Sequence, residues 1–254
     1  MKIKAIIRIT VCFVLFMTLL SILLGGIAIN SLFDDTTPGE TTILQRSVDT
    51  SNLTRLEINW AAGSITIGRG HFIDTMVIKE VMDSKNHHAL STSLDGDALE
   101  INFGDSKINL GKVSGKDLII LVPYNWNCAT LKINGAALDI DINGLEIKRL
   151  ELNGASNRLK FNGKVHNLSV EGAAISLDVG ASSHLSNVNI EGMGCQLDLK
   201  LPSYHGFNAT VEGLGVSFRS DLLYVIKDGH YTYGNCACQI EASGLGCQVT
   251  VNQS

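Results

Sequence analysis

The sequence is poor in aromatic residues and in proline. Only 6% of its 254 residues are aromatic and 3 are proline, whereas 25 are glycine. This composition suits narrow stacked layers of chain filled by Leu, Ile and Val side chains. The glycines follow no strict three-residue period, which excludes a collagen helix.

Signatures of catalysis and of phosphate binding are also missing. The sequence has no Gly-x-Ser-x-Gly elbow, no His-Glu-x-x-His helix and no Walker loop. Gly192-Met-Gly194, Gly213-Leu-Gly215 and Gly244-Leu-Gly246 lack a third glycine and a following helix, so we interpret them as turns. We therefore expect no enzyme activity and assign no catalytic residue, cofactor or metal site.

The longest uncharged apolar run extends from Ile9 to Ile29. At a helical rise of about 1.5 Å per residue, it can span the roughly 30 Å hydrocarbon core of a membrane. Basic residues precede the run and acidic residues follow it, so the positive-inside rule places the bulk of the chain outside the cytoplasm. A signal peptide cleaved near Gly26-Ile-Ala28 is the alternative, and it exports the domain equally.

This segment divides the chain. We expect a cytoplasmic tail over residues 1–8, a transmembrane anchor over 9–29, a linker over 30–45 and an extracytoplasmic domain over 46–254. The expected location is the cell membrane, with a single pass and the C-terminal domain outside. Three of the 20 basic residues lie in the tail, leaving 17 against 25 acidic residues outside, a formal charge near −8. That charge argues against nucleic acid as a partner and against electrostatic docking on anionic lipid.

A degenerate repeat dominates the exported part. A short apolar–polar strand runs into a glycine turn and a second short strand follows, a unit that we call a rung. The turn glycines recur every 18 to 21 residues, at Gly135, Gly154, Gly172, Gly192 and Gly213, and similar rungs lie at 56–67 and 238–251. One supersecondary unit stacked on itself predicts an all-β domain, a β-solenoid or β-helix built rung by rung.

The remaining segments predict further strands and the ends of the stack. Strands are expected at 76–82, 89–94, 99–103 and 118–122, and a hairpin around Lys227-Asp-Gly229. At Gly154 the sequence Ala-Ser-Asn-Arg follows, which predicts a bulge or a looser corner. The irregular segment before Pro123 and the hairpin over 224–233 are the candidate caps against edge pairing.

Two cysteines share one position of the repeat. Aligned on the turn glycines, Cys195 and Cys247 fall in the same column as Leu138, Ile175 and Val216. If the rungs follow in chain order, the two cysteines lie two rungs apart, and their Cα atoms are nearly 10 Å apart. A disulfide tolerates at most about 7 Å, so we predict two small buried side chains without a bond.

The other exported cysteines give less information. Cys236 and Cys238 alternate with Ile240 and are expected to face the core together. No second close pair completes a tetrahedral metal site around them. The five exported cysteines are an odd number, and the pairing of Cys128, Cys236 and Cys238 stays open.

The repeat also carries a candidate interaction face. Glu171, Glu191 and Glu212 each precede a turn glycine, and Glu241 follows Ile240 in the last rung. Asn134 and Asn153 hold the same position in earlier rungs. A stacked column of carboxylates is a candidate surface for a cation or a basic partner. A solvated strand face with splayed side chains is the interpretation that we favour.

The order of several motifs resembles a known family. A rung at Leu56-x-Ile-x-x-x-x-Gly-x-Ile-x-Ile67 is followed by two copies of a strand, a proline and a rung, with prolines at Pro123 and Pro202, and Tyr231-x-Tyr-Gly234 leads to a closing rung. Over residues 45–254 this resembles the bacterial "putative adhesin", or toastrack, family of envelope proteins. The resemblance implies a solenoid-like β-domain on the outer side of the cytoplasmic membrane, with roles in envelope sensing, and it supplies no catalytic residues.

These observations favour a non-enzymatic, membrane-anchored interaction module that senses, scaffolds or adheres. Its expected partners are an envelope membrane protein or a cell-wall polymer, and sheet edges leave self-association open. A carbohydrate-active β-helix enzyme is the first alternative, and it needs a groove with convergent acid, base and Arg or Ca²⁺. An inert structural spacer is the second.

Overall fold

The computed structural model describes residues 41–83, 89–104, 115–180, 185–202 and 204–254. All of its regular elements are strands: β1 (Thr41–Asp49), β2 (Arg55–Trp60), β3 (Gly63–Arg69), β4 (Thr75–Asp83), β5 (Ser91–Asp95), β6 (Ala98–Asn102), β7 (Asp117–Val122), β8 (Cys128–Ala136), β9 (Leu138–Ala155), β10 (Arg158–Ala173), β11 (Ser176–Val179), β12 (Asn187–Met193), β13 (Gln196–Leu201), β14 (Phe207–Leu214), β15 (Ser217–Ser220), β16 (Val225–Lys227), β17 (His230–Tyr233), β18 (Cys238–Leu245) and β19 (Gln248–Gln253).

Within these ranges, no helix is long and apolar enough to cross a membrane. The expected anchor over residues 9–29 lies outside the described residues. Strand β1 already begins at Thr41, so regular β-structure starts inside the segment that the sequence assigns to the linker over 30–45.

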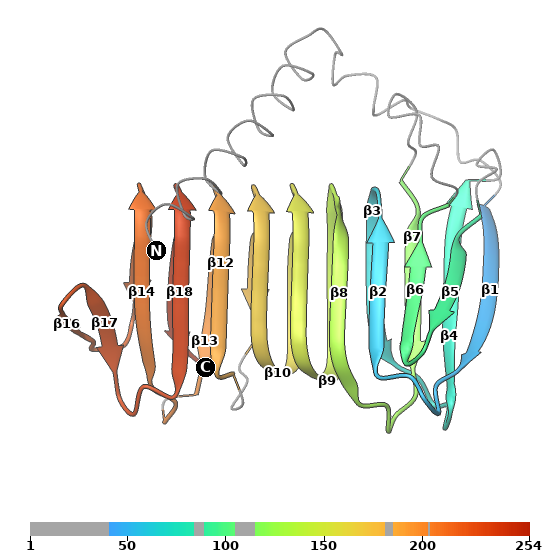
Figure 1. Cartoon of the computed structure of the whole chain (residues 1–254), viewed down its shortest axis with the longest axis horizontal. Helices are drawn as coiled ribbons and strands as arrows, with labels where there is room; N and C mark the ends of the chain where they lie inside the picture. Colours follow the sequence, from blue (N-terminus) through green and yellow to red (C-terminus); the bar gives the residue numbers. More distant parts are fainter. Residues whose placement is uncertain (1–40, 84–88, 105–114, 181–184, 203) are drawn as a thin grey trace, which may run out of the picture.

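The strands form two long rows (Figure 1). The first row runs β5, β6, β2, β8, β9, β10, β12, β18, β14, β17, and the second runs β1, β4, β7, β3, β9, β10, β11, β13, β19, β15. Neighbours are parallel, except that β5, β17, β4 and β1 pair antiparallel at the ends. Strands β9 and β10 are long enough to take part in both rows.

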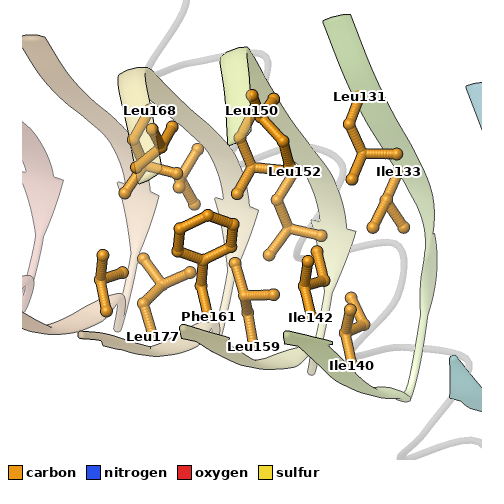
Figure 2. Close-up of a cluster of buried hydrophobic side chains, with 14 of the residues drawn as sticks. Leu131, Ile133, Ile140, Ile142, Leu150, Leu152, Leu159, Phe161, Leu168 and Leu177 are labelled. Atoms are coloured by element: carbon orange, nitrogen blue, oxygen red, sulfur yellow. The ribbon is translucent and has the colours of Figure 1, made fainter. Parts of the chain in front are cut away.

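Alternation along each strand sends apolar side chains between the two rows. In Figure 2, Leu150 and Leu152 of the first row lie opposite Ile140, Ile142 and Leu159 of the second. All five are at most 2% exposed. One column of branched aliphatic residues therefore extends through the stack, and the outward positions carry polar residues.

The turn glycines stack on one another, as the repeat predicts. The pairing places Gly135, Gly154, Gly172 and Gly192 in successive register. The contact is close, because a Cβ built on Gly154 would lie 1.7 Å from the carbonyl oxygen of Gly135. The φ of Gly154 is also +133°, which a residue with a side chain rarely adopts. Only glycine fits at this corner.

The order of the rungs differs from the order of the chain. Gly244 of the last rung pairs with Gly192 on one side and with Gly213 on the other. The rung β18–β19 is therefore inserted between β12–β13 and β14–β15. At the other end, β2 lies between β6 and β8. The expectation that Cys195 and Cys247 lie two rungs apart is wrong, and they occupy neighbouring rungs.

The corner after Gly154 is as tight as its neighbours, which corrects the expected loosening. Gly154 and Ala155 stay in register with Gly135 and Ala136. Asn157, at 2% exposure, replaces an apolar residue in the inward column. Its Nδ2 donates to the Gly135 carbonyl at 3.0 Å, and its Oδ1 accepts from the Leu138 N–H at 3.1 Å. The Asn157 side chain therefore links its own turn to the preceding one, and this corner has the same number of residues as its neighbours.

The two ends of the stack are covered differently. At one end, hairpin β16–β17 covers part of β14, as the sequence predicts for the hairpin cap. At the other end, β4 and β1 pair beyond β7, and β5 pairs beyond β6. These antiparallel strands cover the outward edges of β7 and β6 and part of β14, which limits further addition of strands there.

A buried ion pair lies inside the second of these ends. Glu80 of β4 and Lys116 both have fully buried side chains, and Lys116 Nζ lies 2.8 Å from Glu80 Oε1. Lys116 Nζ also donates to the Phe103 carbonyl at 2.7 Å. The second carboxylate oxygen of Glu80 accepts from the Leu90 N–H at 2.9 Å. This network joins three segments of the end through charge-assisted hydrogen bonds.

Replacing Gly154 with alanine tests the corner geometry. The new Cβ collides with a backbone oxygen and strains the positive φ, so we expect Gly154→Ala to lower the free energy of unfolding by about 3 kcal/mol or more. Gly68 has no atom within 4 Å of a built Cβ and no positive φ. Gly68→Ala is the matched control, and chemical denaturation should show a change within about 0.5 kcal/mol.

Removing one partner of the buried ion pair tests whether the pair stabilises this end of the stack. Lys116→Met leaves the Glu80 carboxylate buried without its cation, so we expect a loss of about 3–5 kcal/mol in thermal or chemical unfolding. Lys79→Met, on the opposite face of β4, is the control and should be nearly neutral. Equal stability of the two variants would contradict a structural role for the pair.

Candidate functional site

The predicted column of four glutamates is not formed. Glu171 and Glu191 are direct neighbours on β10 and β12. Ser243 separates Glu191 from Glu212, because the last rung is inserted between β12 and β14. Glu241 lies in the adjacent line of side chains, between Asn189 and Thr210. Of the four predicted carboxylates, only Glu171 and Glu191 are therefore direct neighbours.

The same column continues as a ladder of asparagines in the other direction. Asn153 Nδ2 donates to Asn134 Oδ1 at 2.9 Å, and Asn134 Nδ2 donates to Asn59 Oδ1 at 2.8 Å. Asn59 Nδ2 then donates to Asn102 Oδ1 at 2.9 Å. All three amides donate in one direction along the stack, so each side chain fixes the orientation of the next.

We call the complete line the polar column; its members are Asn102, Asn59, Asn134, Asn153, Glu171, Glu191, Ser243 and Glu212. Sequence reasoning identified Asn134 and Asn153 but missed Asn59 and Asn102. The signal was present, because Leu56-Glu-Ile-Asn59 and Leu99-Glu-Ile-Asn102 match Leu131-Lys-Ile-Asn134. Strand pairing, which the sequence does not give directly, makes them one line.

A neighbouring line of charged residues supports the ladder. Glu100 Oε1 accepts from Asn59 Nδ2, and Glu57 Oε1 accepts from Asn134 Nδ2, both at 2.9 Å. Lys132 Nζ lies 3.0 Å from Glu57 Oε1. The amides are half-buried and the flanking charges partly exposed, so this network holds the face in one geometry while leaving it open to solvent.

The resulting face offers polar groups in a regular row. It presents amide, carboxylate and hydroxyl groups repeated at the strand spacing of about 4.8 Å. Across the described ranges, no three His, Cys, Asp or Glu side chains are grouped so that they could hold a metal ion. The chemistry on offer is hydrogen bonding to an extended ligand.

The cysteines divide by environment. Cys128, Cys195, Cys238 and Cys247 are buried, and Cys236 is half-buried in the turn before β18. The prediction that Cys236 faces the core with Cys238 is therefore wrong, because β18 begins only at Cys238. All five are free thiols. Burial raises the pKa of Cys128 and of Cys238 to about 12, which makes both poor nucleophiles.

Comparison with known proteins supports the fold. A structure of a putative cell adhesion protein from Clostridium sporogenes matches with a TM-score of 0.54 and 17% identity, covering 85% of this chain and 100% of the other. A putative adhesin from Bacteroides fragilis matches with a TM-score of 0.44 and 9% identity, covering 84% of this chain and 97% of the other. No family model and no curated protein matches the chain. The first structure shows a shared fold, and its name agrees with the family that the sequence resembles.

The paired carboxylates make a testable electrostatic contribution. Like charges directly opposite on neighbouring strands are destabilising, so we expect Glu171→Gln to raise the free energy of unfolding by a few tenths of a kcal/mol at low salt. The gain should fade at high salt because ions screen exposed charges. Glu212→Gln is the control, since Ser243 separates Glu212 from Glu191. An equal gain for both variants in urea unfolding would contradict the register.

Proposed function

We propose that this protein is a non-enzymatic, adhesin-like binding module of the cell envelope. The exported domain is a β-solenoid whose rungs stack as paired strands, and residues 9–29 hold it at the outer side of the membrane. The in-register glycine corners support the solenoid, and the uncharged run after a basic tail supports the anchor. The name of the Clostridium sporogenes structure, a putative cell adhesion protein, supports binding as the general role.

The observation that carries the proposal is the hydrogen-bonded asparagine ladder within the polar column. Side chains on a solvent-facing strand are normally free to rotate, and ordering them costs entropy. Here the amides of Asn59, Asn134 and Asn153 are already held in line. The network uses both N–H groups of the Asn59 and Asn134 amides, so the row presents its amide oxygens to a ligand as preorganised acceptors. Preorganisation lowers the entropic cost of binding a donor-rich ligand that extends along the row.

The chemistry of the face favours a neutral, hydroxyl- and amide-rich polymer as the ligand. Glu57, Glu100 and Glu171 flank or belong to the column, and the exported part is acidic overall. An anionic polymer is repelled by such a face. The glycan strands of cell wall carry many hydroxyl and acetamido groups, which pair with amides and carboxylates without a net charge.

A protein partner is the second candidate. The end of the stack at hairpin β16–β17 exposes apolar side chains, with Leu223 at 94%, Leu214 at 77%, Val225 at 64% and Ile226 at 63%. Exposed apolar patches mark protein or membrane contacts in many proteins. This end is the surface on which a membrane protein or a second copy of the chain would dock.

Sedimentation with insoluble cell wall tests the first candidate. We expect the full-length chain to co-sediment with peptidoglycan stripped of anionic polymers. Asn134→Ala with Asn153→Ala should weaken the affinity about thirtyfold, because two amides of the ladder are lost and each hydrogen bond is worth about 1 kcal/mol. Asp139→Ala with Asp178→Ala, on exposed positions of the second row, should not change it.

Four outcomes contradict this proposal. Equal loss in both double variants shows that the polar column is not the binding face. Binding that disappears with Leu223→Ser and Ile226→Ser instead transfers the role to the hairpin end. Retention by no wall fraction and by no solubilised envelope protein leaves the inert spacer, and release of soluble sugar fragments from the wall reveals an enzyme.

A further inference from the structure

Cys195 and Cys247 occupy equivalent positions on neighbouring rungs. Each follows its turn by one residue, and the flanking residues pair as Gly192 with Gly244 and Gln196 with Gln248. The Gln248 N–H donates to the Cys195 carbonyl at 2.8 Å. Adjacent strands lie about 4.8 Å apart, which is within the Cα separation of about 4.4–6.8 Å that a disulfide requires.

The two thiol groups also lie next to the same residue, Gly192. Cys247 Sγ lies 3.4 Å from the Gly192 carbonyl oxygen, and a Cβ built on Gly192 would lie 3.0 Å from Cys195 Sγ. The Cys195 and Cys247 side chains are close enough for each to shift the pKa of the other. Both residues are 1% exposed and face the interior of the corner.

We infer that Cys195 and Cys247 form an inter-rung disulfide under oxidising conditions. The bond joins β19, the last strand of the chain, to β13 through their adjoining turns. The last rung is the one inserted out of chain order, so the bond holds in place the rung that the order of the chain does not fix. The inferred disulfide does not depend on which ligand the polar column binds.

The oxidation follows ordinary thiol–disulfide exchange with a small disulfide such as oxidised glutathione. The Cys247 thiolate attacks one glutathione sulfur, which forms a mixed disulfide and releases one glutathione thiolate. Cys195 then attacks the Cys247 sulfur, which forms the protein disulfide and releases the second glutathione. Two protein thiols are oxidised, one glutathione disulfide is reduced, and the two thiol protons pass to the two glutathione molecules.

The local environment favours Cys247 as the first nucleophile. Interaction with the Cys195 side chain lowers the pKa of Cys247, whereas interaction with the Cys247 side chain and burial raise the pKa of Cys195. A lowered pKa increases the thiolate fraction near neutral pH. Both cysteines directly follow exposed turn glycines, Gly194 and Gly246, so each thiol lies next to the solvent-facing surface of a turn.

Peptide mapping of the oxidised full-length chain tests this inference. We expect equilibration with oxidised glutathione, followed by alkylation and mass spectrometry without reduction, to yield one cross-linked peptide pair containing Cys195 and Cys247. Reduction should lower the melting temperature by about 5 °C or more, because the bond closes a long loop in the unfolded chain.

Matched variants separate the bond from other effects of the reagent. In Cys195→Ala and Cys247→Ala the reduction-sensitive shift in melting temperature should vanish. In Cys238→Ala, which removes another buried thiol, the shift should persist. Free thiols at both positions after oxidation, a bond between Cys236 and Cys238, or a shift that survives in Cys195→Ala would overturn the inference. The peptide map of the unmodified chain decides the question even if a variant fails to fold.

Discussion

The close approach of successive glycine corners is the constraint on which the rest of the structure depends. At each corner, the carbonyl oxygen of one turn occupies the space that a side chain of the next would need. A Cβ on Gly154, Gly172 or Gly192 would lie 1.7, 1.8 and 1.9 Å from the oxygen of the preceding glycine. These contacts fix the spacing and register of the rungs. The alignment of the core, the polar column and the cysteine pair follows from that register.

Most of the fold could be predicted from the sequence because the rung is a local unit. Alternating apolar residues around a glycine turn specify the two strands, and equal spacing of the turns brings like residues into register. The order of the rungs could not be predicted in this way. Gly192-Met-Gly194, Gly213-Leu-Gly215 and Gly244-Leu-Gly246 are nearly equivalent, so the motif does not say which rungs are neighbours. Strand β17 covers Phe207–Thr210 on the outer edge of β14, and the last rung pairs with the inner edge instead.

That single difference accounts for the main corrections at the candidate site. Insertion of β18 places Ser243 between Glu191 and Glu212, which breaks the predicted line of carboxylates. It also brings Cys247 beside Cys195. Asn59 and Asn102 lie in sequence motifs like that of Asn134, but only pairing across β6, β2 and β8 joins them into a ladder. The buried ion pair of Glu80 is not evident from the sequence. Glu80 shares the inward face of β4 with Met76 and Ile78, but a single charged residue at an inward position does not reveal which distant residue pairs with it.

The rung order is the central claim, and hydrogen exchange tests it most directly. Strand β19 lies between two partners, whereas β15 has a partner on one side only. Backbone amides of β19 should therefore exchange as slowly as those of β13, and amides of β15 should exchange faster, because edge strands open more readily. Slow exchange in β15 together with fast exchange in β19 would place the last rung at the end of the stack. That result would contradict the inserted rung, the interrupted carboxylate line and the cysteine pair together.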